Sequence, residues 1–190
     1  MEKRSPTLSQ RVIARYVDIP QAVTLFDHRQ EENFHDPVLI NETLRLARLS
    51  DRGRFLFRVH PSLKEKQHLN FQAITAGNYV RVHRHEEIEK TEMFRLLVGE
   101  MDVVFLDTNE NVTNVVRLSE NGRKTCVVRP NQYHTVITYK DTVVLEAKSQ
   151  ANYGYNPETD KSFAPWSPEE GTPEANNYYN NLLELVKSYK

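Results

Sequence analysis

The chain has 190 residues, of which 27% are charged, and its 25 basic and 26 acidic side chains leave a formal net charge of -1. That length suits one compact domain with additions at its ends. The near-neutral charge, with no run of more than two Lys or Arg residues, argues against a nucleic-acid-binding protein.

Hydrophobic pattern and cysteine content exclude further classes. No apolar stretch is long enough to cross a bilayer or to form the core of a signal peptide, so we expect a soluble, cytoplasmic protein without a membrane partner. Cys126 is the only cysteine, which excludes a disulfide within this sequence and a cysteine-based zinc site. Any metal would therefore be bound by histidine, carboxylate and water.

The first part of the chain, residues 1–53, is predicted to be an arm followed by a short helix. Residues 1–37 are polar and have neither a helical nor a strand period. Asn41 could then cap a helix that ends before Gly53. The apolar positions of that helix are Ile40, Leu44 and Ala47.

Residues 54–150 have the sequence pattern of an all-β domain. Short runs rich in β-branched and aromatic residues alternate with polar or glycine-containing breaks, and no helical pattern separates them. This spacing is typical of an antiparallel sandwich or barrel. The predicted strands lie within residues 54–60, 68–76, 78–85, 92–107, 111–118, 125–130, 134–139 and 142–148.

The last part, residues 151–190, is predicted to wrap the barrel and then form a helix. The segment after Lys148 is rich in Pro, Gly, Asn and Ser, but it carries aromatic residues that could pack on a surface. An amphipathic helix follows, with one apolar face. That face comprises Tyr179, Leu182, Leu183, Val186 and Tyr189.

Two histidines stand one residue apart in a strand-like run. His83 and His85 would share one face of that strand, with Cα atoms roughly 6 to 7 Å apart. Residues 92–98 should return antiparallel as a hairpin, which would place Glu92 opposite the histidines. His134 opens a strand directly after a turn-forming segment and is expected at the same barrel mouth. Three imidazoles and one carboxylate in this arrangement could bind a divalent metal.

The neighbouring polar residues have simpler interpretations. Glu86 and Glu87 are expected in a solvated turn. Arg81 would share the histidine face, where its forked donors could bind an anionic substrate group or a salt-bridge partner at the rim. Tyr79 on the same face could be a pocket wall or part of the core.

These residues resemble the two conserved motifs of the cupins, which are small β-barrels that hold a divalent metal between two sheets. The segment ending in His134 resembles the second motif. The residues that match the first motif are Gly77, His83, His85, Glu92 and Gly99. The resemblance implies a cupin (double-stranded β-helix, or jelly-roll) barrel with His83, His85, Glu92 and His134 as metal ligands.

A narrower resemblance, over about residues 40–171, is to the WbuC-type cupin-fold metalloproteins, which occur with surface-polysaccharide biosynthesis genes. Residues 155–171 carry its most specific part, although a tail that seals the barrel end would also explain them. The chain departs from the family in a longer turn before Glu92, which makes Glu89 a rival ligand, and in Asn131 at a glycine position. Asparagine tolerates the left-handed conformation that such a turn requires.

The resemblance implies a protein that binds Fe, Mn, Ni, Zn or Co and acts on a small polar, possibly saccharide, intermediate of surface-polysaccharide biosynthesis. Such an enzyme would be a metal-dependent isomerase or epimerase. The alternatives are an iron-dependent dioxygenase and a non-catalytic ligand-binding or regulatory cupin. Because many cupins pair through their sheets, we also expect a homodimer.

Overall fold

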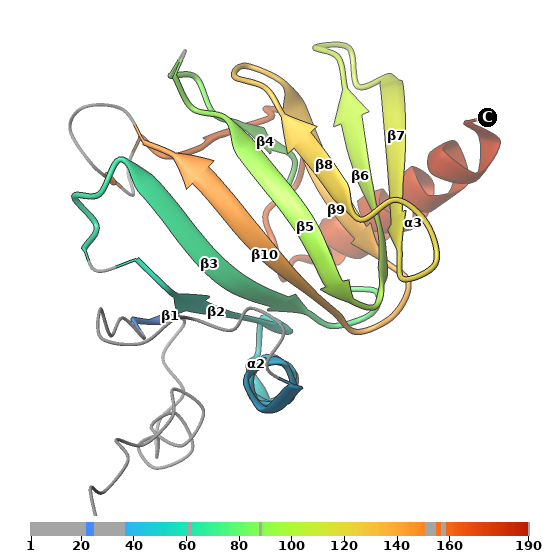
Figure 1. Ribbon diagram of the computed structural model, residues 1–190. Helices are drawn as coiled ribbons and strands as arrows, with labels where there is room; N and C mark the ends of the chain where they lie inside the picture. Colours follow the sequence, from blue (N-terminus) through green and yellow to red (C-terminus); the bar gives the residue numbers. More distant parts are fainter. Residues whose placement is uncertain are drawn as a thin grey trace, which may run out of the picture.

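The computed structural model describes residues 22–24, 37–60, 62–87, 89–150, 155–156 and 159–189. The predicted arm, residues 1–37, lies outside the described residues except for β1 (Ala22–Thr24) and Pro37. The described chain forms two β-sheets that face each other, with one helix on the outer side of each (Figure 1).

The first sheet contains six strands, which pair antiparallel except for β1 and β2. Its order is β1, β2 (Arg54–Arg58), β3 (Gln67–Ile74), β10 (Thr142–Ser149), β5 (Glu92–Val98) and β8 (Thr125–Val128). The second sheet has five antiparallel strands. Its order is β11 (Ser162–Phe163), β4 (His83–Arg84), β9 (Tyr133–Thr138), β6 (Glu100–Leu106) and β7 (Val112–Ser119).

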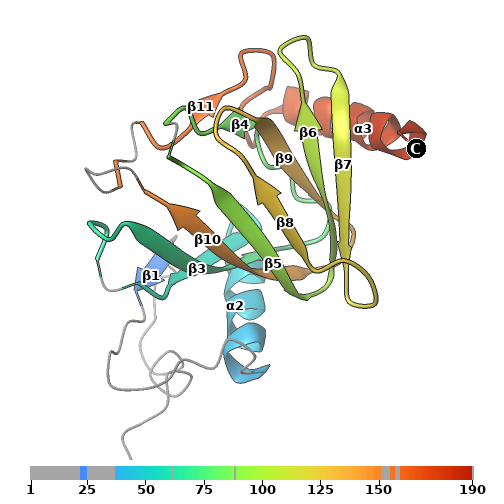
Figure 2. The ribbon, with the colours of Figure 1, turned by 45° about the horizontal axis from the view of Figure 1, so that its top comes forward.

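Consecutive strands repeatedly change sheet. β4 lies in the second sheet and β5 in the first, and the same change of sheet separates β5 from β6, β8 from β9 and β9 from β10. The predicted hairpin of residues 78–98 is therefore wrong: β4 pairs with β9 and β11, whereas β5 pairs with β10 and β8. This winding is that of the cupin (double-stranded β-helix) barrel that the motifs implied (Figure 2).

Helix α2 (Pro37–Leu49) covers the outer face of the first sheet. It begins four residues before Asn41, because proline is well suited to a first helical turn; the predicted cap at Asn41 was wrong. Its buried side chains pack against Phe55 and Phe57 of β2. Since side chains alternate along a strand, Arg54 and Arg58 of β2 point to the other side, towards the barrel interior.

Helix α3 (Pro173–Ser188) is the predicted C-terminal amphipathic helix, and its apolar face covers the second sheet. Thr172 caps it by accepting a hydrogen bond from the Ala175 N–H, and Leu182 and Val186 are buried against the sheet. Tyr189 lies just beyond the helix end, where its hydroxyl donates to the Thr113 carbonyl at 2.7 Å.

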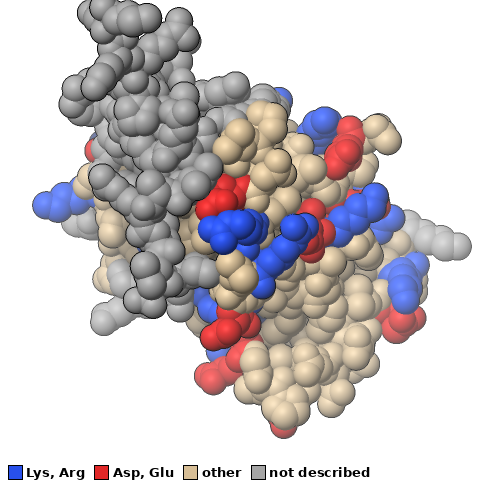
Figure 3. All heavy atoms as spheres, turned by 90° about the horizontal axis from the view of Figure 1, so that it is seen from below, with Lys and Arg blue, Asp and Glu red and all other residues tan. Residues whose placement is uncertain are grey.

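The described surface mixes charges of both signs. On the face shown in Figure 3, basic side chains lie next to acidic ones rather than gathering in a patch. Pairs such as Arg45–Glu42 and Arg48–Asp141 are of this kind. In the described part of the chain, no helix is both long enough and apolar enough to cross a bilayer.

Candidate metal centre

Four buried side chains converge between the two sheets. They are His83, His85, Glu92 and His134, and each offers one ligand atom within 4.8 Å of the other three. His83 of β4 is paired directly with His134 of β9, and His85 follows β4. Glu92 reaches the group from the first residue of β5 in the facing sheet. The cluster therefore fits a metal site that joins the two sheets.

The turn before β9 helps to place two of these residues. Asn131 has a left-handed φ of 61°, which asparagine tolerates better than most residues. Its N–H donates to the backbone carbonyl of His85 at 2.8 Å. The turn that leads into His134 is thus attached to the backbone that carries His85.

Each imidazole of the cluster is oriented by a backbone carbonyl. The Nδ1 atoms of His83 and His134 lie 2.9 Å from the carbonyl oxygens of Arg81 and Gln132. The Nδ1 atom of His85 lies 2.5 Å from the carbonyl of Asp160. A carbonyl can only accept, so Nδ1 carries the proton in all three rings. The Nε2 lone pairs are left free, as metal-ligating histidines require.

These lone pairs face a carboxylate. Oε2 of Glu92 lies 3.0 Å from Nε2 of His134 and 3.3 Å from Nε2 of His85. Nε2 of His83 is buried without a partner among the described residues. Burial lowers the pKa of His83 well below its usual range and also lowers the pKa of His85, so both rings favour the neutral form. Acceptors that converge without protons are stabilised by a cation bound between them.

A buried ion-pair network supports the carboxylate. Nζ of Lys148 lies 3.4 Å from Oε1 of Glu92, and it also contacts Glu146 and Asp160. Although burial alone would raise it, the pKa of Glu92 is held well below its usual range, chiefly by the positive charge of Lys148. Lys90, itself buried, pairs with Asp160 at 3.2 Å. Glu92 is therefore kept ionised, as a metal ligand must be.

The structure brings Glu92, and not its rival Glu89, into the cluster. Glu89 is exposed and lies in the connection between β4 and β5. That connection passes from one sheet to the other, so its length is set by the crossing rather than by a hairpin turn. Glu86, as expected for a solvated turn, is exposed and pairs with Arg84.

Tyr79 and Arg81 lie elsewhere than their alternation with His83 suggested. Residues 78–82 are not regular strand, and Val80 lines the small cavity beside the cluster instead. The Tyr79 hydroxyl donates to the Pro168 carbonyl at 3.2 Å. Arg81 donates to the Ser167 carbonyl at 3.0 Å, and its guanidinium stacks on the Phe163 ring. Both side chains hold the C-terminal wrap against the barrel.

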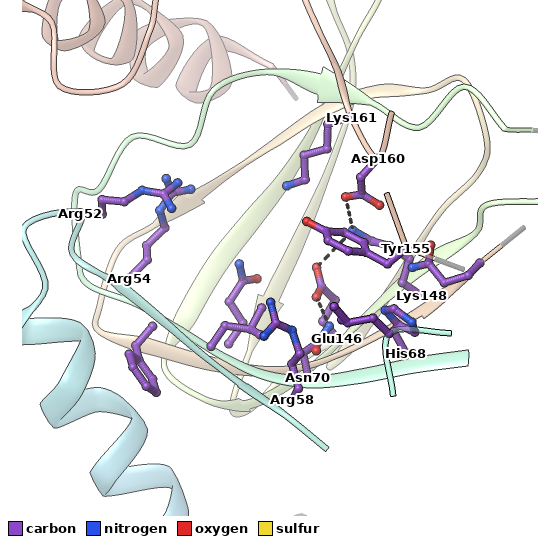
Figure 4. Close-up of a pocket in the computed structure, with 15 residues that line it drawn as sticks. Arg52, Arg54, Arg58, His68, Asn70, Glu146, Lys148, Tyr155, Asp160 and Lys161 are labelled. Atoms are coloured by element: carbon purple, nitrogen blue, oxygen red, sulfur yellow. Dashed lines mark hydrogen bonds and ion pairs between the residues drawn. The ribbon is translucent and has the colours of Figure 1, made fainter. Parts of the chain in front are cut away.

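Two adjoining cavities give access to the cluster. The smaller, about 30 Å³, is lined by His83, Glu92 and His134. The larger, about 250 Å³, opens beside it (Figure 4). Side chains that line both cavities are Arg54, Gln72, Glu146 and Lys161. A molecule in the larger cavity would therefore lie next to the candidate metal centre.

The larger cavity contains residues that the sequence motifs did not indicate. Burial raises the pKa of Glu146 to about 8, and its carboxyl accepts a hydrogen bond from Asn70 at 2.7 Å. Glu146, Lys148 and Gln150 occupy alternate positions along β10 and just beyond it, so all three face the interior. Polar residues with this period in a core strand were the signal that could have identified them.

Comparisons with known proteins find one family model and several solved structures of low sequence identity. A family model described as a domain of unknown function, DUF6016, matches residues 35–118. No curated protein matches the chain.

Similar solved structures include an uncharacterised double-stranded β-helix protein from Klebsiella pneumoniae, with 13% identity and a TM-score of 0.45 over 60% of this chain and 82% of that one. An rmlC-like cupin protein from Desulfovibrio desulfuricans is 23% identical, with a TM-score of 0.40 over 50% of this chain and 81% of that one. The capsular polysaccharide assembling protein CapF from Staphylococcus aureus is 16% identical, with a TM-score of 0.47 over 60% of this chain and 30% of that one. The cupin fold of this chain follows from its own strand order.

Proposed function

We propose that this protein is a divalent-metal-binding cupin of the WbuC type that converts a small polar molecule at the metal centre. The observation that carries the proposal is the orientation of the three imidazoles. Each donates Nδ1–H to a backbone carbonyl and turns a free Nε2 towards the buried carboxylate of Glu92. Such rings are fixed before an ion arrives, which favours metal binding over a merely structural polar cluster.

The donor set suits several ions. Three neutral nitrogens and one carboxylate oxygen are compatible with Fe, Mn, Ni, Zn or Co. When bound, such an ion would supply a Lewis acid for a carbonyl or hydroxyl oxygen. The chain itself keeps Glu92 charged through Lys148 and keeps the site buried, with entry through the larger cavity.

The proposed substrate is a small polar molecule, and a saccharide intermediate of surface-polysaccharide synthesis is the candidate that the WbuC resemblance implies. An isomerisation or epimerisation would use the metal to polarise a carbonyl or hydroxyl. A dioxygenase would instead require iron and consume oxygen, and a binding protein would leave the ligand unchanged. Oxygen uptake and product analysis with a bound ligand separate these three activities.

The first test is the metal content of protein purified without a metal-affinity tag, measured by mass spectrometry. We expect about one transition-metal ion per chain, and its loss in His83→Ala. His60→Ala is the matched control, because His60 is as buried as His83, with 4% of each residue exposed, but lies outside the cluster. Wild-type protein without metal, or His83→Ala with a full complement, would contradict the proposal.

A further inference from the structure

We infer that the larger cavity binds a small polyhydroxylated anion, with Arg58 and Lys161 as the charged contacts of its carboxylate or phosphate group. The inference rests on the proposed function, because this cavity adjoins the candidate metal centre. It adds the class of ligand and the residues that select it.

The charges that line the cavity are unbalanced. Its described walls carry five cationic side chains against the two carboxylates of Glu146 and Asp160. Three of the cations are paired: Arg52 and Arg54 with Glu170, and Lys148 with Glu92, Glu146 and Asp160. The cationic side chains are Arg52, Arg54, Arg58, Lys148 and Lys161.

Arg58 and Lys161 are the remaining two. Neither forms an ion pair with any residue that the structure describes. They come from opposite walls, Arg58 from β2 and Lys161 from the segment that leads into β11, and both are drawn at the cavity in Figure 4. A guanidinium in such a position offers two parallel donors to an oxyanion. Among the described residues these two cations therefore have no ion-pair partner, which favours a negatively charged ligand.

Uncharged polar atoms in the same walls indicate hydroxyl groups. Nε2 of His68, Oδ1 of Asn70 and both amide atoms of Gln150 are buried without a hydrogen-bond partner among the described residues. All three residues line the cavity and are less than a tenth exposed. Donors and acceptors are both left open, and a hydroxyl group can satisfy either kind. A ligand with several hydroxyls would pair these atoms, which are costly to leave unpaired.

The dimensions favour a ligand of about one sugar ring. The cavity of about 250 Å³ corresponds to roughly eight water molecules at ~30 Å³ each. Lys161 lines this cavity and also the smaller one that contains His83, Glu92 and His134. A ligand bound to Lys161 would therefore lie next to the metal centre.

The test is isothermal titration calorimetry of the full chain with D-glucuronate, D-glucose 6-phosphate and D-glucose. We expect one or both anions to bind at least tenfold more tightly than glucose, and the tighter one identifies the charged group. Arg58→Gln should weaken that binding by about tenfold or more, the range for a charge-assisted hydrogen bond, and Lys161→Met should do the same. Arg95→Gln should have no effect, because Arg95 is an exposed arginine of β5 that lines neither cavity.

Equal affinity for glucose and the two anions would overturn the inference, as would anion binding that Arg58→Gln and Lys161→Met both leave unchanged. Metal content is measured on the same samples. Failure of the proposed function would appear as wild-type protein without metal, whatever the calorimetry shows. Failure of the ligand inference would appear as metal-containing protein without a preference for anions.

Discussion

Replacing Glu92 by glutamine tests the candidate metal centre most directly. The amide keeps the size of the side chain but removes the negative charge that faces Nε2 of His85 and His134. Four-ligand protein zinc sites bind with about 10 to 16 kcal/mol, so an equal share for one ligand is about 3 kcal/mol. That share corresponds to about a hundredfold weaker metal binding.

The assay is competition with a chromophoric chelator on metal-free protein reloaded with Zn²⁺. Glu89→Gln is the control, since it removes a carboxylate of the same connection that is exposed and lies outside the cluster. Its affinity should equal that of the wild type. Circular dichroism of both variants checks that the fold is kept, because Lys148 retains Glu146 and Asp160 as partners in Glu92→Gln. If Glu92→Gln bound Zn²⁺ as tightly as Glu89→Gln, the assignment of the carboxylate ligand would be refuted.

Three further predictions concern stability. Burial lowers the pKa of His68 to about 4. Between about pH 6.5 and 4 the unfolded chain therefore binds a proton at His68 that the folded chain does not, so the free energy of unfolding falls as the pH falls. His68→Gln should make that pH dependence less steep in urea unfolding, and an unchanged slope would refute the prediction. Lys90→Ala should lower the free energy of unfolding by about 1.5 to 3 kcal/mol, because it removes the buried contact with Asp160 while Lys148 still pairs with that carboxylate. An unchanged denaturation curve would contradict this. Gly99→Ala should lower the free energy of unfolding by about 1 to 3 kcal/mol or more. The reason is that φ is 97° at Gly99 and that a Cβ there would lie 2.5 Å from Oγ1 of Thr142. An unchanged melting temperature would contradict this.

The strands were predictable because their signal is local. Alternation and turn residues between 54 and 150 indicated the runs that form β2, β3 and β5 to β10, and the apolar face of residues 179–189 indicated α3. The pairing of the strands could not be predicted from this local signal. Adjacent runs were expected to form a hairpin, but the chain crosses between sheets after His85, and a sequence pattern does not distinguish a long turn from a crossing.

The candidate site was also predictable only in part. His83, His85, Glu92 and His134 were indicated by motif spacing, and the structure brings them together. Tyr79 and Arg81 were assigned to the same face by extending the strand period through a segment that is irregular. Lys161 was noticed only as part of the tail, because its position in the cavity wall depends on where the wrap returns to the barrel.

The acceptors that orient the three imidazoles are main-chain atoms of residues 81, 132 and 160. Since every amino acid supplies such a carbonyl, the direction of the rings does not itself depend on which side chain stands at these positions, although Asp160 also pairs with Lys90 and Lys148. Relatives with the same centre could therefore differ at positions 81 and 132 while the rings keep their direction. A survey of variable and invariant positions in a sequence alignment would miss these main-chain carbonyls. Substitution of single side chains would not remove them either. Only changes that displace the backbone, such as an insertion beside residue 160, would reveal how the ligands are held.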